Sequence, residues 1–175
     1  MMMRKTKLWV ALGFFLSACG SVVMTESALA DTAQAEAQKA IRAIYDKRSA
    51  AIAEFDAEGA WSNHANGYIS ITTKGERITA AQSKENLQTL LDVAESISSH
   101  TIMQKITLKG DTATVLIRDS ATVVFPDPKS EDKKGVFKAT ERAVDTWVKR
   151  KGLWLHTQNK TLSSFVTVNG KQIKE

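Results

Sequence analysis

The chain has 175 residues, of which 24 are basic and 19 acidic, and a formal net charge of +5. The basic residues are dispersed between acids and form no stripe, which argues against nucleic-acid binding. One cysteine excludes an internal disulfide, and three histidines without paired spacing indicate neither a metal site nor a metal cofactor.

The N-terminus has the pattern of an export signal. Three basic residues precede the apolar run 8–16, which is too short to span a bilayer but suits a signal-peptide core. Cleavage after Ala30 gives a signal of residues 1–30 and a domain with a net charge of +3, because the signal holds three bases and one acid. Alternatively, residues 16–19 resemble a lipobox, so that the signal is 1–18 and Cys19 carries lipid; otherwise Cys19 is a small apolar residue of the core.

This N-terminal pattern predicts an exported protein, either periplasmic or secreted. Contact with a membrane is expected only through a lipid anchor, if Cys19 is acylated. The folded domain is expected over 31–168, followed by a short tail at 169–175.

Two helices are predicted in the first half of the domain. The first covers 32–55 and ends near Gly59, because apolar residues recur there at spacings of three and four. A short strand follows around Ile69 and Ile71, and Thr79 or Ser83 caps the second helix. The apolar stripe of the first helix comprises Ala37, Ile41, Ile44, Tyr45, Ile52 and Phe55, and that of the second comprises Leu87, Leu90, Leu91 and Ala94.

From Ile97 onward the apolar period changes to two, which predicts four antiparallel strands. Ile102, Ile106 and Leu108 are expected on one face of the first of these strands. Residues 125–135 hold both prolines and many charges, which is typical of a solvated hairpin loop. The last two strands cover 136–148 and 153 to about 166, with 149–152 as their turn; Val115, Ile117, Ala121 and Val123 mark the strand before them.

Three local motifs accompany this order of elements: the stretch 55–61 (FDAEGAW) after the first helix, the turn 75–79, and the hairpin 147–154 (WVKRKGLW). With these motifs the chain resembles the nuclear transport factor 2-like superfamily, in particular its SnoaL-like bacterial subfamily of unassigned function. The resemblance implies an α+β, cone-shaped fold in which N-terminal helices pack on a strongly curved antiparallel sheet. It also implies a pocket inside the cone and a homodimer.

The closing hairpin carries the candidate chemistry. With a four-residue turn, Asp145 lies opposite His156, close enough for a carboxylate to orient an imidazole base. Trp147, Trp154 and Gln158 are expected on the same face. The alternative is a weak rim contact between the two residues, with the tryptophans in the core or at a dimer face.

Three functions remain open on the sequence. The preferred one is an exported binding or scaffold domain for an unknown small molecule, with Trp61, Tyr68, Trp147 and Tyr45 lining the pocket. The second is an isomerase, cyclase or dehydratase without a cofactor, which uses Asp145 and His156 as catalytic residues. The third is an interaction module whose pocket is vestigial.

Overall fold

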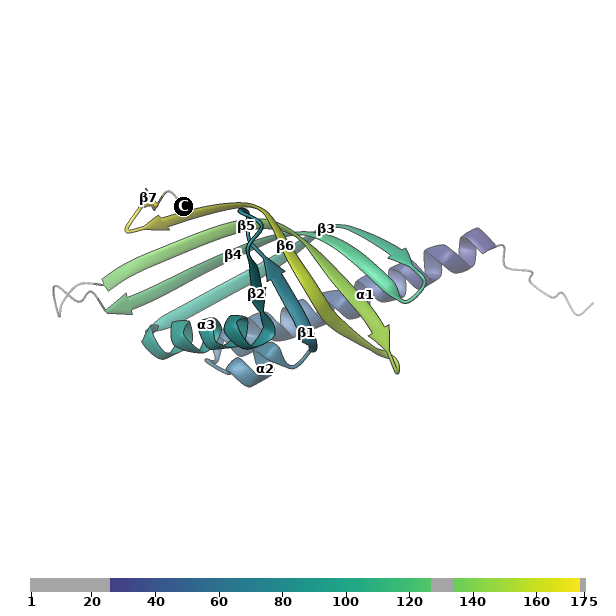
Figure 1. The fold of residues 1–175 in the computed structure, drawn as a ribbon, viewed down its shortest axis with the longest axis horizontal. Coiled ribbons are helices and arrows are strands. Elements are labelled where there is room, and N and C mark those ends of the chain that lie inside the picture. The colour runs from purple at the N-terminus through teal and green to yellow at the C-terminus, as the bar shows by residue number, and fades with distance from the viewer. Residues whose placement is uncertain (1–25, 127–133, 174–175) are drawn as a thin grey trace, which may run out of the picture.

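The computed structural model describes residues 26–126 and 134–173. Within these ranges lie three helices, α1 (Glu26–Ala53), α2 (Ala57–Trp61) and α3 (Ala80–Val93). Figure 1 shows the long strands arching over the helices, which lie on the hollow side of the sheet. The predicted α+β cone is therefore confirmed. The strands are β1 (His64–Ile71), β2 (Arg77–Thr79), β3 (Ser96–Lys109), β4 (Thr112–Pro126), β5 (Lys134–Arg150), β6 (Leu153–Val168) and β7 (Lys171–Ile173).

The sheet is mixed, whereas the sequence predicted an antiparallel one. Its strand order is β2-β1-β6-β5-β4-β3, with β7 added to β6. All neighbours are antiparallel except β1 and β6, which run parallel and align His64 with His156. This pairing brings side chains of β1 beside the closing hairpin, a neighbourhood that local sequence patterns do not reveal.

Bulges bend the long strands and change which residues face inward. In β3 the pairing with β4 shifts between Met103 and Lys105, so Gln104 is the extra residue. A bulge reverses the alternation of side chains, so Ile102 is 49% exposed while Met103 packs against the core. The prediction that Ile102 shares a face with Ile106 was therefore wrong.

The first helix ends where a second one begins. Helix α1 stops at Ala53, and Phe55 adopts a positive φ of 60° and is 40% exposed, so it is not part of the buried stripe. Asp56 then caps α2 by accepting a hydrogen bond from the backbone N–H of Gly59 at 2.8 Å. Gly59 therefore lies inside a short helix instead of stopping the long one. Helix α3 begins at the predicted cap, Thr79, which forms a capping box with Gln82.

Three predicted segments lie partly or wholly at the limits of the described ranges. Most of the predicted export signal, including Cys19, lies in residues 1–25, which are outside the described ranges. The expected loop 125–135 is shortened, because β4 extends to Pro126 and β5 begins at Lys134. In the expected tail, Lys171–Ile173 pairs with β6 as β7.

The interior consists of two apolar clusters, both of which include residues of α1. The first surrounds Tyr45 and Trp147, and the second surrounds Ile52 and Leu91. Helix α1 contributes to both because its buried residues recur along one face. The first cluster comprises Ala37, Ile41, Tyr45, Ala113, Val115, Ile117, Ala143, Trp147 and Trp154, and the second comprises Ala51, Ile52, Ala57, Ala60, Leu91, Ile97 and Val123.

The closing hairpin turns on two residues, whereas the sequence predicted four. Arg150 pairs with Leu153, so Lys151 and Gly152 form the turn, with φ values of 50° and 82°. Two consecutive positive φ values are the signature of a type I′ turn, whose twist matches that of the flanking strands.

We expect Gly152→Ala to lower the free energy of unfolding by about 1–2 kcal/mol, because a Cβ atom is disfavoured in the left-handed region. Urea unfolding measures the change. Gly67→Ala is the control, since Gly67 has no positive φ and open space around its Cβ position. An equal loss of stability in both variants would contradict the prediction.

Candidate functional site

A polar layer separates the two apolar clusters. On α1, Arg48 lies between Tyr45 of the first cluster and Ile52 of the second. Residues three and four apart share one face of a helix, so Arg48 points inward with these two buried neighbours. The helix therefore places a guanidinium group inside the cone.

The sheet places two rows of polar or small residues at the same level. Thr101, Asp119 and Glu141 are direct partners across β3, β4 and β5. Two residues further along these strands, the next row of inward-facing residues consists of Ser99, Ala121 and Ala139. These rows lie between an apolar row of Met103, Ile117 and Ala143 and another of Ile97, Val123 and Phe137.

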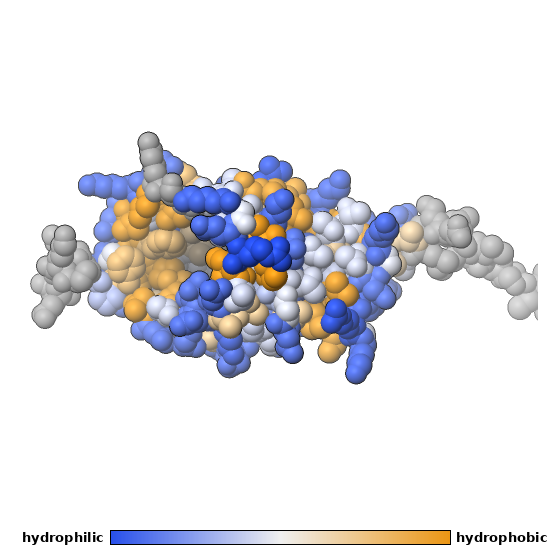
Figure 2. Space-filling view, in the orientation of Figure 1, coloured by the Kyte–Doolittle hydropathy of each residue, from blue (hydrophilic) through white to orange (hydrophobic). Residues whose placement is uncertain are grey.

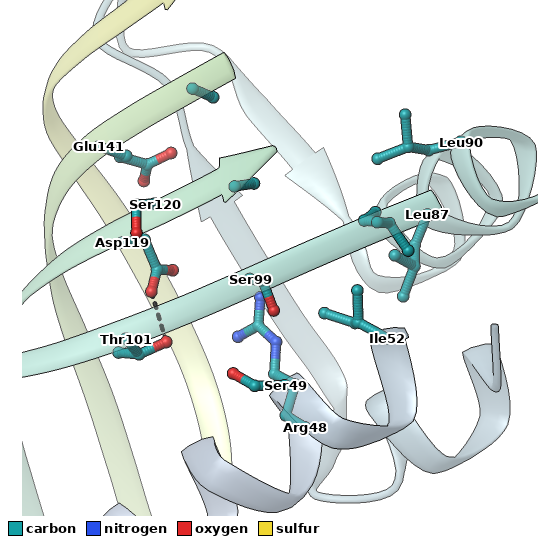
Figure 3. Close-up of a pocket in the computed structure, with 13 residues that line it drawn as sticks. Arg48, Ser49, Ile52, Leu87, Leu90, Ser99, Thr101, Asp119, Ser120 and Glu141 are labelled. Atoms are coloured by element: carbon teal, nitrogen blue, oxygen red, sulfur yellow. Dashed lines mark hydrogen bonds between the residues drawn. The ribbon is translucent and has the colours of Figure 1, made fainter. Parts of the chain in front are cut away.

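The small residues of this layer leave a cavity of about 180 Å³ between the sheet, α1 and α3. Figure 3 shows Arg48 between Asp119 and Glu141 on one side and the aliphatic side chains of Ile52, Leu87 and Leu90 on the other. On the face drawn in Figure 2, a hollowed area rimmed by apolar residues lies toward the side of α3. The lining residues are Arg48, Ser49, Ile52, Leu87, Leu90, Ile97, Ser99, Thr101, Asp119, Ser120, Ala121, Ala139 and Glu141.

The charged groups of this cavity face it without pairing with each other. Among the described residues, Arg48 has neither a hydrogen bond nor an ion pair within 4.0 Å. Asp119 accepts a hydrogen bond from the Thr101 hydroxyl, and Glu141 accepts one from the Thr161 hydroxyl at 2.8 Å. In the part of the chain that the structure describes, the second oxygen of each of these two carboxyl groups has no hydrogen-bond partner and is available to a ligand.

Burial shifts the acid–base properties of these groups. Desolvation raises the pKa of Asp119, although Arg48 and Thr101 oppose the shift. Desolvation also raises the pKa of Glu141, and the nearby Asp119 adds to that effect. Burial alone would lower the pKa of Arg48, but the acidic groups around it outweigh this cost and raise the value. The surroundings therefore favour the charged form of Arg48, whereas burial disfavours the charged forms of Asp119 and Glu141.

A second cavity of about 270 Å³ shares Arg48, Leu87, Asp119 and Glu141 with the first. Its other side is formed by β1 and β6 together with α2. Trp61, His64, Tyr68, His156 and Asn159 are among the residues that line it. The polar layer therefore lies where two cavities meet, and His156 contacts the second of them.

The pairing of Asp145 with His156 exists, but not through the predicted register. Asp145 is opposite Asn159, and Trp147 is opposite His156. The two-residue turn and a bulge at Thr157 produce this register, and they also turn Gln158 to pair with Thr146. The imidazole nonetheless reaches diagonally to the carboxylate, with His156 Nε2 3.2 Å from Asp145 Oδ1.

The Asp145 carboxylate is fully buried and surrounded by donors. Its Oδ2 accepts a hydrogen bond from the Tyr45 hydroxyl at 2.6 Å, and its Oδ1 accepts one from Asn159 Nδ2 at 2.9 Å. The Tyr45 hydroxyl in turn accepts one from Trp147 Nε1 at 3.0 Å. Burial alone would raise the pKa of Asp145, but the charge of His156 and these hydrogen bonds outweigh it and lower the value.

The two histidines form a chain of hydrogen bonds that fixes their protons. His64 Nδ1 lies 3.2 Å from the carbonyl oxygen of Trp61, so it must donate, which leaves His64 Nε2 as an acceptor. That nitrogen is 3.3 Å from His156 Nδ1, which must therefore donate as well. His156 Nε2 is also near two acceptors, Asp145 Oδ1 and the Gln158 carbonyl oxygen. The hydrogen-bond network therefore assigns His156 as an imidazolium paired with Asp145.

The four residues predicted to line a ligand pocket lie in two different places in the structure. Trp61 and Tyr68 line the second cavity, where Trp61 stacks on His64 with ring centroids 3.9 Å apart. Tyr45 and Trp147 are buried in the first apolar cluster, where Trp147 stacks on His156. Catalytic roles for Asp145 and His156 stay predictions.

Sequence reasoning did not single out Arg48, Asp119 or Glu141. Each nevertheless follows the pattern of an inward-facing element: Arg48 is three residues after Tyr45, and Asp119 is two after Ile117. Arg118, the neighbour of Asp119 on β4, is exposed, whereas Asp119 is half-buried. Within residues 26–126 and 134–173, no group of three potential metal ligands is found, and no helix is long and apolar enough to cross a membrane.

Comparison with known proteins agrees with this architecture. Residues 33–158 match the family model of the SnoaL-like domain. This range includes the three charged residues of the polar layer and the Asp145–His156 pair. No curated protein sequence matches the chain.

Several solved structures share the fold at low sequence identity. A conserved protein from Planctomyces limnophilus is 15% identical, with a TM-score of 0.63, and the match covers 77% of this chain and 98% of that one. A proposed scytalone dehydratase from Novosphingobium aromaticivorans is 18% identical, with a TM-score of 0.57 and coverage of 77% and 89%. A hexachlorocyclohexane dehydrochlorinase is 9% identical, with a TM-score of 0.56 and coverage of 82% and 93%.

Proposed function

Because the chain belongs to the SnoaL-like domain family, we propose that it is a small-molecule-binding domain whose ligand occupies the cavity at the polar layer. The observation that carries this proposal is the composition of that cavity. Aliphatic side chains form one side, and Arg48, Asp119 and Glu141 form the other. Ligand sites typically combine such an apolar lining with a few polar groups that fix orientation.

The volume of the cavity limits the ligand. Drug-sized ligands occupy roughly 300–1,000 Å³, whereas a cavity of about 150 Å³ accommodates benzene. The cavity of about 180 Å³ therefore suits a molecule with a small ring or a short branched chain. The presence of this cavity also argues against a vestigial pocket, because Trp147 lies in the first apolar cluster and does not fill the cavity.

Export remains part of the proposal, on the strength of the basic and apolar pattern of residues 1–30. A homodimer likewise remains a proposal, which rests on the family resemblance.

An acid–base enzyme is the second candidate. Its support is the Asp145–His156 pair beside the second cavity, together with solved structures of the same fold that include a dehydrochlorinase. However, both ring nitrogens of His156 are engaged by protein acceptors. The Asp145 oxygens accept hydrogen bonds from Tyr45 and Asn159 and pair with His156. Proton transfer to a substrate would require one of these bonds to open, so binding is the better supported function.

We expect the neutral alcohol 3-methylbutan-1-ol to bind in this cavity, because its branched chain fits the aliphatic side. Saturable NMR shifts of the Leu87 and Leu90 methyl groups measure binding. Ala121→Leu places a larger side chain in the cavity and should weaken binding at least about ten-fold. The matched control is Ala43→Leu on the exposed side of α1, which should bind like the native protein. Equal binding by the two variants would contradict the proposal, and so would the absence of saturable shifts in the native protein.

A further inference from the structure

The polar layer holds charges of both signs that are exposed to one cavity and not neutralised by each other. Arg48 is without an ion pair within 4.0 Å among the described residues, although Asp119 and Glu141 line the same space. The Ser99 hydroxyl, a buried polar group at the same wall, has no hydrogen-bond partner within the described part of the chain. Arg48, Asp119 and Glu141 are half-buried at this cavity, and charges and hydroxyl groups removed from bulk water are normally paired, so a ligand with complementary groups would satisfy them.

The signs of these charges restrict the ligand. An anion would satisfy Arg48 but would be repelled by the two carboxylates, and a cation would have the opposite difficulty. A molecule that carries both charges satisfies both sides of the layer. Its carboxylate would accept hydrogen bonds from the Arg48 guanidinium and the Ser99 hydroxyl, and its ammonium group would donate to Asp119 and Glu141.

The remaining lining restricts the rest of the molecule. Figure 3 shows Ile52, Leu87 and Leu90 on the side of Arg48 that is opposite to the acids. This aliphatic side favours a short branched hydrocarbon group, which a volume of about 180 Å³ accommodates. An α-amino acid carries its ammonium, carboxylate and side chain on one carbon atom, and so presents all three to the three parts of the lining.

We propose that the cavity at the polar layer binds a free aliphatic α-amino acid of about the size of leucine. Arg48 binds the carboxylate, Asp119 and Glu141 bind the ammonium group, and the aliphatic side chains of α1 and α3 enclose the hydrocarbon. The assignment rests on the proposed function, because it requires that this cavity is the ligand site. The raised pKa of Asp119 and Glu141 agrees with it, since an ammonium group would replace the hydration that these carboxylates lose.

Calorimetric titration of the native protein near neutral pH tests the ligand class with four compounds. L-Leucine is compared with 4-methylpentanoate, which lacks the ammonium group, with 3-methylbutan-1-amine, which lacks the carboxylate, and with glycine, which lacks the hydrocarbon. Leucine should bind at least about ten-fold more tightly than each of the others, because each lost charged hydrogen bond or buried side chain costs more than about 1.4 kcal/mol.

Variants assign the charges to residues. Arg48→Met and Asp119→Asn should each weaken leucine binding at least about ten-fold, and by a larger factor than any change in the binding of 3-methylbutan-1-ol, which has no charged group to lose. Arg118→Met is the matched control, because Arg118 precedes Asp119 on β4 and is exposed on the outer face. If Arg48→Met does not fold, Arg48→Gln replaces it, and Asp119→Asn provides an independent test.

Two results would overturn the assignment. One is leucine binding no tighter than 4-methylpentanoate or the amine, and the other is leucine binding that is unaffected by both Arg48→Met and Asp119→Asn. If 3-methylbutan-1-ol binds in either case, the cavity is still a ligand site and only the amino-acid class is wrong. If neither the alcohol nor leucine binds, the proposed function fails as well.

Discussion

Replacement of Asp145 with alanine is expected to lower the free energy of unfolding by about 3–5 kcal/mol, the cost of removing one partner from a buried ion pair. The carboxylate accepts hydrogen bonds from Tyr45 and Asn159 and balances the charge of His156. Without it, the two donors Tyr45 and Asn159 and the buried charge of His156 lose their partner. The loss therefore comes mainly from groups that remain, and less from the missing side chain itself.

Urea unfolding followed by circular dichroism measures this loss. Asp145→Asn should be less damaging than Asp145→Ala, because the amide oxygen can still accept the hydrogen bond from Tyr45 but cannot balance the imidazolium. Asp46→Ala is the matched control, since Asp46 is exposed on α1 beside Tyr45 and should change stability by less than about 0.5 kcal/mol. A loss below about 1 kcal/mol for Asp145→Ala would show that the carboxylate is not a structural anion.

The general architecture could be predicted because it depends on periodicity. Apolar residues at spacings of three and four indicate the helices, and alternation of apolar and polar residues indicates the strands. The local cap at Thr79 was also predictable, because the residue type and the Gln three positions later define a capping box. What failed was register: a single extra residue at Gln104 or Thr157 reverses the alternation, and nothing in the local sequence marks it.

The candidate site was predicted only in part because it is assembled from four elements. The proximity of Asp145 and His156 could be predicted because both lie in one hairpin, whose two strands are joined by a short turn. Arg48, Asp119 and Glu141 lie far apart in the sequence, and each alone is an ordinary charged residue. Their common level in the cone emerges only when the pairing of β3, β4 and β5 is known. The sequence does carry one indication of such residues: each is a charged residue at a position where the periodicity of its helix or strand predicts a buried apolar one.

The stability of the protein is expected to fall by a few kcal/mol as the pH decreases from about 6.5 to about 3, and His64 is expected to be the main cause. Burial, followed by the charges of His156 and Arg48, lowers the pKa of His64 from 6.5 to about 3. In this window the unfolded chain binds a proton at His64 that the folded protein does not bind. Acid therefore favours the unfolded state, by an amount on the order of 3 kcal/mol after allowance for partial exposure of the ring.

Other groups in the same region contribute with known signs. The pKa of Asp145 is lowered, so its stabilisation is complete above its unfolded value of 3.8 and is lost only below that pH. The pKa values of Asp119 and Glu141 are raised, so protonation favours the folded state and opposes the effect of His64. A variant of His64 is therefore needed to separate its contribution from theirs.

His64→Gln should remove most of the decrease in stability between pH 6.5 and pH 4, because glutamine does not titrate and its amide oxygen can accept the hydrogen bond from His156. Chemical denaturation at a series of pH values measures the slope for each protein. His100→Gln is the matched control, since it makes the same substitution at an exposed position on β3. A native slope that persists in His64→Gln would mean that His64 already carries a proton in the fold. The assignment of the extra proton to His156 would then be wrong, because His64 Nε2 could no longer accept a hydrogen bond from it.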